Sequence, residues 1–511
     1  MTKRALISVS DKTGLVDFVS GLHKEGWEII ATGGTKTLLD KSGIPTTEIS
    51  KITGFPEICD GRVKTLHPKV HGALLGVRSN AEHLQALKDN GIEFIDLVCV
   101  NLYPFAQTIA KPDVTLNEAI EKIDIGGPSM LRSAAKNFES VTVVCNPEDY
   151  DKVLKEIQQH GDTTLETRME LSAKAYTHTA QYDCCIATYM RAKAGLPEKL
   201  FLEFDLKQPL RYGENPHQSA NFYAATKKES YSLANAEQIQ GKELSYNNIQ
   251  DANAALSIVR DFSEPFCVAL KHMNPCGAAQ ADSIEQAWGK AFKADPVSIY
   301  GGIVAVNRTL TKEVALGMKP IFLEIVIAPD YTPEALEILS SKKNLRVLKI
   351  DMTPSADAVN QYVGVTGGML VQHLDTKTEQ LTVEQSVTDL QPSPEILADL
   401  QFAWKIVKHV KSNAIVVAQD LQTRGIGAGQ MNRVGSAQIA LKQATAEGDA
   451  DRLVLASDGF LPFDDTVELA AEYGIKAIVQ PGGSIRDNDC IAKANEKQIS
   501  MLLTGVRHFK H

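Results

Sequence analysis

The segment CVALKHMNPCGAA, residues 267–279, places Lys271, His272 and Asn274 side by side at the end of an apolar run that is typical of a buried strand. An imidazole titrates near neutral pH and can accept a proton from a reacting group. An ammonium group beside it can stabilise negative charge that develops in the same step. A strand ending in a polar turn would explain these residues without chemistry, because Asn-Pro and Gly favour turns. Both interpretations stay open at this point.

Polar clusters also follow three apolar runs in the first part of the chain: SVSDKTG (8–14), ATGGT (31–35) and VNLYPF (100–105). In an open parallel sheet the carboxyl ends of the strands lie along one edge, where ligands usually bind. Hydroxyls, an ammonium group and glycine amides at helix N-termini suit a phosphate group. The residues that carry them are Ser8, Ser10, Lys12, Thr13, Gly33, Gly34 and Thr35. A helix cap would explain Ser10 equally well.

Two further stretches are rich in charge. Residues 60–72, DGRVKTLHPKVHG, hold Arg62, Lys64, His67, Lys69 and His71. Residues 123–137, IDIGGPSMLRSAAKN, place Asp124 before a Gly-Gly pair, with Arg132 and Lys136 at helical i, i+4 spacing on one face. The alternative is a solvated helix face with an acidic start. In the second half, Arg211, Tyr212, His217 and Arg507 are candidate anion ligands, and the glycine-rich residues 425–433 match neither nucleotide fingerprint.

The elements that must position these residues follow an α/β pattern. The 511 residues predict two to four domains. Leu15, Phe18, Val19 and Leu22 have helical spacing up to Gly26, and the apolar runs at 94–102 and 141–145 suit parallel strands covered on both faces. Residues 165–200 are predicted to be a helical connection. Beyond it, strand and helix patterns alternate in two passages separated by the polar residues 374–395, so an internal duplication is possible.

Composition excludes several classes of protein. The net charge of -10 argues against a nucleic-acid binder with a broad basic face. No apolar stretch is long enough to span a membrane, and the N-terminus lacks the pattern of a signal peptide. The eight cysteines include no Cys-x-x-Cys pair, which predicts free thiols in a reducing cytoplasm.

Taken together in order, the motifs resemble one known family across essentially the full length. They are SVSDKTG, GRVKTLHP, NLYPF, IDIGG with AAKN, RYGENPHQ, KHMNPCG, SNA, GAGQMNR and GFLPF. The family is the bifunctional purine-biosynthesis enzymes that join phosphoribosylaminoimidazolecarboxamide (AICAR) formyltransferase to inosine monophosphate (IMP) cyclohydrolase. The resemblance implies formyl transfer from 10-formyltetrahydrofolate to AICAR, giving formyl-AICAR, and then dehydrative closure of the purine ring to IMP.

The resemblance also implies the architecture. Residues 1–198 would be a methylglyoxal-synthase-like open parallel sheet that closes the ring, with the helical connection at 165–198. Residues 199–511 would be a duplicated cytidine-deaminase-like α/β unit that transfers the formyl group, with subdomains at about 199–373 and 374–511. A homodimer with formyltransferase sites at the subunit interface is implied as well. The expected partners are small molecules, with no nucleic acid and no membrane.

Site residues carry over from the matched motifs. In the first unit, Lys64, Tyr103, Asp124 and Lys136 would be catalytic. The phosphoribosyl group would be held by Ser10, Lys12, Thr13, Gly34, Thr35, Thr65 and Asn101. In the second unit, Lys271, His272 and Asn413 would be catalytic, with Asn413 and Phe460 on the folate. The nucleotide would be held by Arg211, Tyr212, Gly301, Arg507 and the acidic Glu324.

Two other functions compete with this interpretation. A zinc nucleobase deaminase would need Cys-x-x-Cys and His-x-Glu, but Cys276 is followed by Gly277, Ala278 and Ala279. No catalytic metal is therefore expected. The first unit could instead be a regulatory module that senses a small molecule, although binding a phosphate does not require the carboxylate of Asp124 among the cations.

Overall fold

The computed structural model describes residues 2–226, 229–354, 359–446 and 451–511. By its internal contacts the chain divides into two units, Met1–Leu202 and Glu203–His511, whereas the sequence-based boundary follows residue 198. Within the described ranges, no helix has the length and apolar character needed to cross a bilayer.

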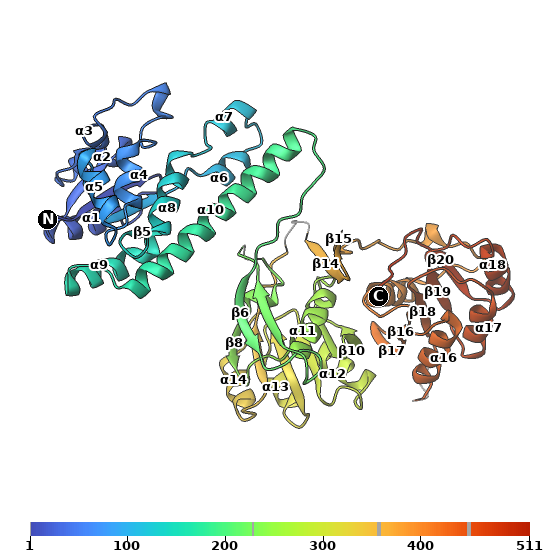
Figure 1. Ribbon diagram of the computed structural model, residues 1–511. Helices are drawn as coiled ribbons and strands as arrows, with labels where there is room; N and C mark the ends of the chain where they lie inside the picture. Colours follow the sequence, from blue (N-terminus) through green and yellow to red (C-terminus); the bar gives the residue numbers. More distant parts are fainter. Residues whose placement is uncertain (1, 227–228, 355–358, 447–450) are drawn as a thin grey trace. The chain divides into compact units, whose positions relative to one another are not determined.

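Unit 1 is built on a five-stranded parallel sheet with the strand order β3-β2-β1-β4-β5 (Figure 1). The strands are β1 (Arg4–Val9), β2 (Glu28–Ala31), β3 (Thr47–Glu48), β4 (Leu97–Asn101) and β5 (Thr142–Val144). Ala5 of β1 lies opposite Ile29 on one side and Leu97 on the other. The nearly continuous burial of β1 and β4 confirms the predicted parallel sheet.

Ten α-helices accompany this sheet in the described part of unit 1. They are α1 (Leu15–Lys24), α2 (Gly33–Lys41), α3 (Ile49–Thr53), α4 (Pro68–Leu75), α5 (Ala81–Asp89), α6 (Phe105–Ile109), α7 (Leu116–Ile120), α8 (Gly126–Lys136), α9 (Tyr150–His160) and α10 (Leu165–Lys193), with short 3-10 turns at Cys59–Gly61 and Pro147–Asp149. The predicted apolar positions of α1 are all buried. The long α10 packs along α8, so it forms part of the unit's structure as well as leading out of it (Figure 1).

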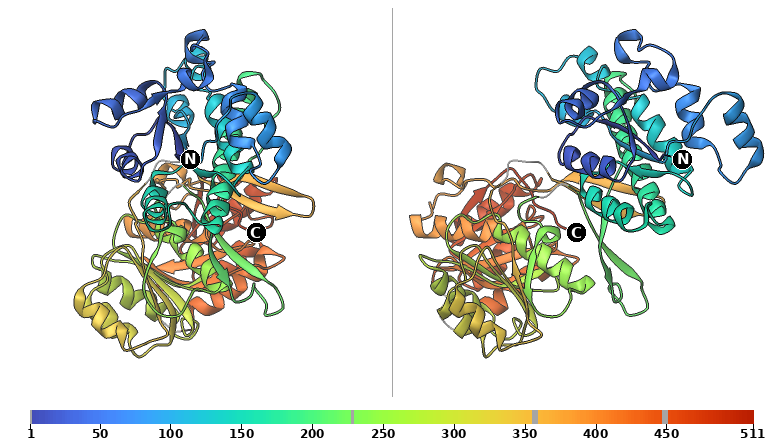
Figure 2. Two further views of the ribbon diagram at one scale, coloured as in Figure 1. Left: turned by 60° about the vertical axis from the view of Figure 1, so that its left-hand side comes forward. Right: turned by 90° about the vertical axis from the view of Figure 1, so that its left-hand side faces the viewer.

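Unit 2 is built on an eleven-stranded mixed sheet with the order β20-β19-β18-β16-β17-β10-β9-β11-β12-β13-β8. Its strands are β8 (Glu237–Gln240), β9 (Phe266–Lys271), β10 (Asn274–Gln280), β11 (Gly302–Val306), β12 (Leu323–Ala328), β13 (Arg346–Lys349), β16 (Ile415–Gln419), β17 (Gln422–Gly427), β18 (Val454–Ser457), β19 (Ala477–Gln480) and β20 (Ser500–Leu503). Two antiparallel ribbons, β6 (Asp205–Leu210) with β7 (Ala220–Ala224) and β14 (Asn360–Val365) with β15 (Gly368–His373), extend from it (Figure 2).

The described helices of unit 2 reveal an internal repeat. They are α11 (Tyr246–Val259), α12 (Ile284–Ala294), α13 (Lys312–Met318), α14 (Pro333–Ser340), α15 (Pro394–Val407), α16 (Arg433–Ala444), α17 (Asp465–Glu472) and α18 (Asp487–Glu496), with 3-10 turns at Leu233–Asn235 and Val383–Gln385. The order α11-β9-β10-α12-β11-α13-β12-α14-β13 recurs as α15-β16-β17-α16-β18-α17-β19-α18-β20. Each repeat pairs a hairpin with one antiparallel strand and then two parallel strands, and β10 pairs with β17 to join the repeats. The duplication is therefore real, while the likeness to cytidine deaminase stays a prediction.

The strand directions of the two repeats decide where the site lies. Pairing is antiparallel along β16-β17-β10-β9-β11 and between β16 and β18. It is parallel from β11 through β12 to β13 and from β18 through β19 to β20, and the edge strand β8 pairs antiparallel with β13. The carboxyl ends of β9, β18, β19 and β20 therefore share one edge with the amino ends of β11, β12, β13 and β16. We call this the site edge.

The connection after β9 differs from the turn that the sequence allowed at Asn-Pro. The turn consists of His272 and Met273, and Asn274 already begins β10, which bulges between Pro275 and Gly277. The glycine-rich segment also has a packing role. A Cβ on Gly425 or Gly427 of β17 would come within 1.9 Å of a carbonyl oxygen of α16, so these glycines allow strand and helix to approach closely.

Candidate active sites

Unit 1 contains a cavity of about 630 Å³ at the carboxyl ends of β1, β2 and β4. Nine of the residues predicted for ring closure and phosphoribosyl binding line it: Ser10, Lys12, Gly34, Thr35, Lys64, Thr65, Asn101, Tyr103 and Asp124. They come from loops far apart in sequence, as expected at the ligand-binding edge of an open parallel sheet.

Two predicted residues of unit 1 do not line this cavity. The amide and hydroxyl of Thr13 donate to Oδ1 of Asp11 at 3.0 and 2.7 Å, so Thr13 shapes the loop after β1. Lys136 is the last residue of α8 and is exposed. At the helical rise of 1.5 Å per residue, its backbone lies about 15 Å from Gly126 at the cavity. Their binding and catalytic roles remain predictions.

Two of the lining side chains hold the cavity wall together. Oδ1 of Asn101 accepts the backbone N–H groups of Ser10 and Asp11 at 2.6 and 2.9 Å, and its Nδ2 donates to the Asp11 carbonyl at 2.9 Å. The buried hydroxyl of Thr35 bonds both backbone groups of Val9 at 3.1 Å. These two residues therefore fix the loop after β1, while one N–H of Asn101 is left for a ligand.

An anion is favoured at the amino end of α2. Its N-cap Thr32 makes no side-chain capping bond, and Gly33 and Gly34 of the first turn line the cavity. A Cβ on Gly33 would lie only 3.3 Å from Nζ of Lys64, so the ammonium group sits directly over this turn. Nζ of Lys64 also pairs with Glu57 at 2.9 Å. Backbone N–H groups, the positive helix end and the ammonium together suit a phosphate.

Asp124 is the predicted catalytic carboxylate among the four acidic residues that line this cavity. Burial raises the pKa of its carboxyl, and the hydrogen bond that Oδ1 accepts from Gly127 N–H at 2.8 Å opposes this rise. The backbone N–H of Asp124 donates to the hydroxyl of Tyr182 at 2.8 Å, and that hydroxyl donates to the Lys122 carbonyl at 2.9 Å. Tyr182 lies on α10, so sequence reasoning that treated α10 as a connection missed it.

In unit 2, seven of the predicted residues lie along the site edge. Lys271 and His272 stand at the carboxyl end of β9, Gly301 and Glu324 at the amino ends of β11 and β12, and Asn413 before β16, while Phe460 and Arg507 follow β18 and β20. Both repeats therefore contribute predicted residues to the site edge. Arg211 and Tyr212 follow β6 in a separate ribbon, where the guanidinium lies 5.6 Å from the Tyr212 ring centre.

Two of the site-edge residues from the first repeat, Lys271 and Glu324, are held by contacts within that repeat. Nζ of the half-buried Lys271 donates to the carbonyl of Tyr300 at 2.9 Å, next to Gly301. The imidazole of His272 is exposed and so can reach a ligand. Glu324 pairs through Oε2 with Arg346 at 2.7 Å, which compensates part of its charge.

Asn413 is held by a buried network in the second repeat. Its Oδ1 accepts from Nη2 of Arg433 at 2.9 Å, and its Nδ2 donates to the Gln430 carbonyl at 2.9 Å. Arg433 pairs in turn with the fully buried Asp458, which also accepts from the Ser412 hydroxyl. The carboxamide is thus fixed, with one N–H still able to donate to a substrate oxygen. Arg433 ends the GAGQMNR motif, but sequence reasoning assigned no role to Arg433 or to Asp458.

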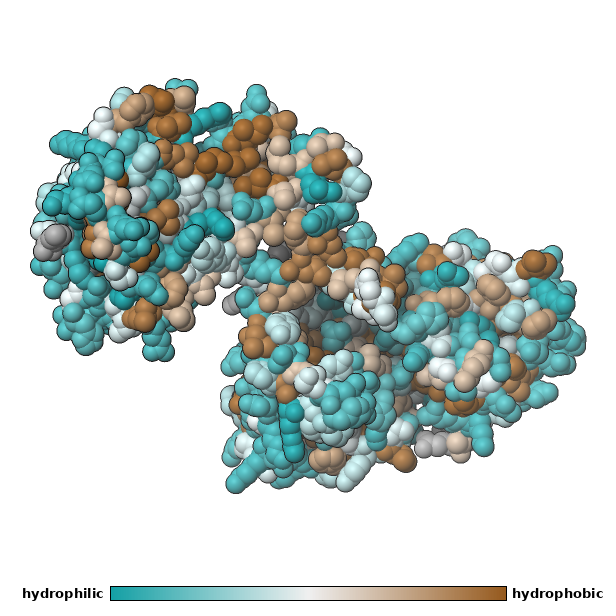
Figure 3. Space-filling model, in the orientation of Figure 1, coloured by the Kyte–Doolittle hydropathy of each residue, from teal (hydrophilic) through white to brown (hydrophobic). Residues whose placement is uncertain are grey.

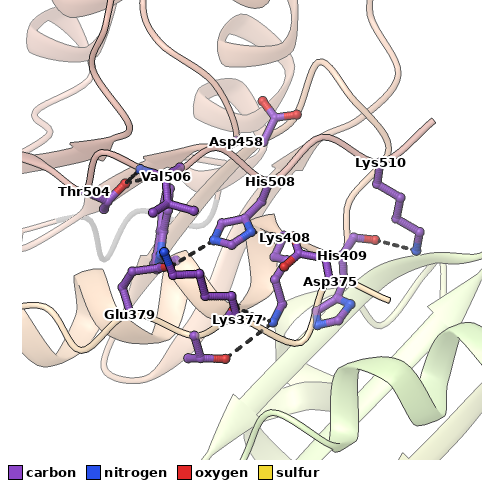
Figure 4. Close-up of polar contacts among 12 residues, drawn as sticks. Asp375, Lys377, Glu379, Lys408, His409, Asp458, Thr504, Val506, His508 and Lys510 are labelled. Atoms are coloured by element: carbon purple, nitrogen blue, oxygen red, sulfur yellow. Dashed lines mark hydrogen bonds and ion pairs between the residues drawn. The ribbon is translucent and has the colours of Figure 1, made fainter. Parts of the chain in front are cut away.

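The chain segment that carries Arg507 is anchored by its neighbour His508, whose side chain is only 1% exposed. Nδ1 of His508 lies 2.6 Å from Oδ2 of Asp375, and Nε2 lies 3.0 Å from Oε2 of Glu379 (Figure 4). The backbone N–H of His508 donates to the Asp458 carbonyl at 3.0 Å. We call the contacts of His508 with Asp375 and Glu379 the His508 clamp. Through the bond to Asp458, His508 also connects the segment of the predicted anion ligand Arg507 to the Asn413 network.

This clamp predicts a pH-dependent stability. Burial, the largest single effect, lowers the pKa of His508, but the bonds and charges of Asp375 and Glu379 together raise it above 6.5. The charged clamp therefore contributes fully below about pH 6.5 and loses its contribution as the pH rises through the folded pKa. We expect the wild type to exceed His508→Gln in free energy of unfolding by more at pH 6 than at pH 9, as measured by urea unfolding.

The exposed residue His23 supplies the control, because His23→Gln removes an imidazole without touching the contacts of His508. A difference between wild type and His508→Gln that stays constant or grows towards pH 9 would contradict the charged clamp.

The cysteine of the KHMNPCG motif has no metal-like surroundings. Burial raises the pKa of the Cys276 thiol to about 12, and its Sγ donates to the Ala269 carbonyl at 3.4 Å. Among the residues that the structure describes, no group of three or more His, Cys, Asp or Glu side chains is arranged to hold a metal ion.

Comparison with known proteins identifies the family. A family model described as "AICARFT/IMPCHase bienzyme" matches residues 134–443, and one described as "MGS-like domain" matches residues 14–129. The bifunctional purine biosynthesis proteins PurH of Streptococcus thermophilus and of Streptococcus pyogenes serotype M4 are 58% and 56% identical to this chain, and each alignment covers 100% of both proteins. The crystal structure of ForH is 38% identical over 36% of this chain and 95% of that chain, with a TM-score of 0.34.

The fold and the sites define a two-unit α/β enzyme in which an MGS-like parallel sheet precedes a duplicated mixed sheet. The chain belongs to the AICARFT/IMPCHase bienzyme family. It is a bifunctional enzyme of purine biosynthesis, with AICAR formyltransferase and IMP cyclohydrolase activities.

Proposed function

We propose that unit 1 closes the purine ring and that unit 2 transfers the formyl group. The observation that carries this division is that each unit gathers its own set of predicted residues, one set around the unit 1 cavity and the other along the site edge of unit 2. No residue is shared between the two sets. Each reaction therefore has its own groups for binding and proton transfer.

For formyl transfer we propose that His272 is the general base. The amine of AICAR is a weak nucleophile, because its lone pair is delocalised into the ring that bears the carboxamide. A base that titrates near neutral pH must remove its proton as it attacks the formyl carbon of 10-formyltetrahydrofolate. The exposed imidazole at the site edge is available for this step, and Lys271 beside it can stabilise the oxyanion that develops. The bond between the formyl carbon and N10 of the folate then breaks, and the proton taken by His272 passes to N10, so that tetrahydrofolate leaves as the neutral amine.

Asn413 and Phe460 are the proposed folate contacts. The fixed carboxamide of Asn413 has one N–H left to donate to the formyl oxygen, since its other groups are held by Arg433 and Gln430. Phe460 is 40% exposed after β18, so an aromatic face is available to a pterin or benzoyl ring. Arg211, Tyr212, Gly301, Glu324 and Arg507 remain the proposed contacts to the nucleotide.

For ring closure we propose that the carboxamide nitrogen of formyl-AICAR attacks its own formyl carbon in the unit 1 cavity and that water is then lost. The raised pKa of Asp124 suits a group that takes or returns a proton. Lys64 and Tyr103 line the same cavity and can stabilise or protonate oxygen. Because a carboxyl of raised pKa lines the same cavity as Lys64 and Tyr103, catalysis is favoured over a purely regulatory sensing role.

We also propose a cytoplasmic homodimer without a catalytic metal. The β14–β15 ribbon exposes apolar side chains that a second copy would cover: Tyr362, Val363, Val365, Met369, Leu370 and Val371. Figure 3 shows apolar residues gathered at the surface around this ribbon. Eight free cysteines support a reducing compartment. Sedimentation of the purified chain measures the proposed oligomeric state directly.

The assay that tests the proposed function supplies the purified protein with AICAR and 10-formyltetrahydrofolate and follows IMP. We expect IMP to form at an unchanged rate after exhaustive chelation of zinc, because proton transfer is assigned to His272 and Asp124. A rate that falls on chelation and returns only with added zinc would contradict the metal-free assignment. The absence of IMP in both samples would reject the proposed function.

A further inference from the structure

The hairpin that carries His272 has an unusual backbone for its sequence. His272 and Met273 form a two-residue connection, and both have positive φ angles, of 53° and 64°. Such connections favour Asn-Gly or Gly-Gly, because residues with larger side chains rarely occupy this region. A His-Met pair therefore needs support from its surroundings to keep this conformation.

The support acts on a single peptide unit. The carbonyl of His272 accepts from Nδ2 of Asn274 at 3.0 Å, and the N–H of Met273 donates to Oδ1 of Asp251 at 2.7 Å. These are the two ends of the peptide bond between His272 and Met273. Without them the backbone of His272 could leave the left-handed region, and the imidazole would move with it.

The carboxamide of Asn274 also reaches the other half of the site. Its Oδ1 accepts the backbone N–H of Lys411 at 3.0 Å, two residues before Asn413. One side chain thus ties the turn of the proposed base to the segment that presents the proposed formyl-oxygen donor. Both partners of Asn274 are backbone groups with fixed donor and acceptor roles, so the orientation of the amide is determined by the hydrogen bonds.

The second repeat shows which part of this arrangement belongs to the fold. Its hairpin turn, Asp420 and Leu421, also has positive φ angles, and the N–H of Leu421 donates to Asp399 of α15 at 2.7 Å, as that of Met273 does to Asp251 of α11. The Asp420 carbonyl accepts from Nζ of Lys290 at 2.9 Å, whereas Gln422 takes the place of Asn274. That turn lies at the opposite edge of the sheet. Both repeats therefore hold the hairpin turn by hydrogen bonds to its backbone. The side chain of Asn274, in addition, links the turn of His272 to the segment that carries Asn413.

We propose that Asn274 is a positioning residue for formyl transfer. It holds His272 and Asn413 in their relative positions through backbone contacts and does not itself take part in proton transfer. This inference rests on the proposed function of unit 2. A misplacement of about 1 Å between reacting groups can cost about 10²-fold in rate, so a single bridging carboxamide can have a large effect.

The test compares Asn274→Leu and Asn274→Asp with the control Lys290→Met, which removes the matching carbonyl bond from the second hairpin. Leucine loses both contacts of Asn274, and aspartate keeps an acceptor for Lys411 but loses the donor to His272. We expect the kcat of formyl transfer to fall about 10²-fold in both Asn274 variants, with KM for AICAR and the ring-closure rate near wild type. Lys290→Met should keep the wild-type kcat.

Three outcomes would overturn the proposal. The first is a kcat for Asn274→Leu within threefold of wild type, and the second is an equal loss of kcat in Lys290→Met. The third is a loss that appears in KM alone. His272→Asn, measured in the same assay, separates the causes: a fast His272→Asn would reject the base assignment and this inference together, whereas a slow His272→Asn with a fast Asn274→Leu would reject the inference alone.

Discussion

Replacing His272 with asparagine is expected to slow formyl transfer by about 10²- to 10⁴-fold, the usual contribution of a positioned general base. Asparagine tolerates positive φ better than most residues, so the turn is kept while the base is removed. Ring closure should stay at the wild-type rate, because His272 belongs to unit 2 and the ring-closure residues line a cavity within unit 1. Single-turnover assays with AICAR and with formyl-AICAR measure the two steps separately.

His23→Asn is the matched control, since it changes an exposed histidine on α1 and should leave both steps unchanged. A His272→Asn enzyme that transfers formyl groups within threefold of the wild-type rate would remove His272 from the mechanism. Loss of both steps would instead indicate general misfolding, which unfolding by urea would detect.

The second large effect is expected at Asp124. Asp124→Asn should slow ring closure of formyl-AICAR by about 10²- to 10⁴-fold, because the carboxyl of raised pKa is replaced by a group that cannot exchange a proton. The amide oxygen can still accept from Gly127 N–H, so the start of α8 should keep its conformation. Formyl transfer from 10-formyltetrahydrofolate to AICAR should be unchanged.

Asp113→Asn, in an exposed loop of the same unit, is the control and should close the ring at the wild-type rate. If Asp124→Asn also retained that rate, Asp124 would be limited to holding the α8 terminus. The proton transfer of ring closure would then have to be assigned to Lys64 or Tyr103.

Much of the fold could be predicted from the sequence, because a strand that is buried on both faces of its sheet is a continuous apolar run. Such runs predict the strands β1, β4 and β5, and the spacing of apolar residues predicts the helix α1. Because the strands are parallel, their carboxyl ends bring the cavity residues together. The repeat in unit 2 was expected from the alternating pattern and from the family resemblance, but residue matching does not show it, because it is kept in strand order and pairing. Side chains at matching positions differ, as Asn274 and Gln422 do.

Site residues that belong to a recognisable motif could be predicted from the sequence. Residues that act through tertiary contacts could not. Tyr182, Asp251 and Asp458 act on backbones or side chains that are distant in sequence, so no local pattern indicates them. The His272–Met273 turn was missed because its residues are atypical of a tight hairpin. Lys136 and Thr13 show the reverse: their motifs are present, yet both lie outside the cavity lining.

The central claim, that each unit carries its own complete site, is tested most directly by mixing the two inactive variants. His272→Asn and Asp124→Asn chains, each unable to complete the sequence alone, are combined with AICAR and 10-formyltetrahydrofolate, and IMP is measured over time. The account predicts that the mixture forms IMP after a lag, because formyl-AICAR made by the Asp124→Asn chain is closed by the His272→Asn chain. A mixture that forms no IMP, when urea unfolding shows both variants to be folded and either one alone has lost both steps, would contradict it.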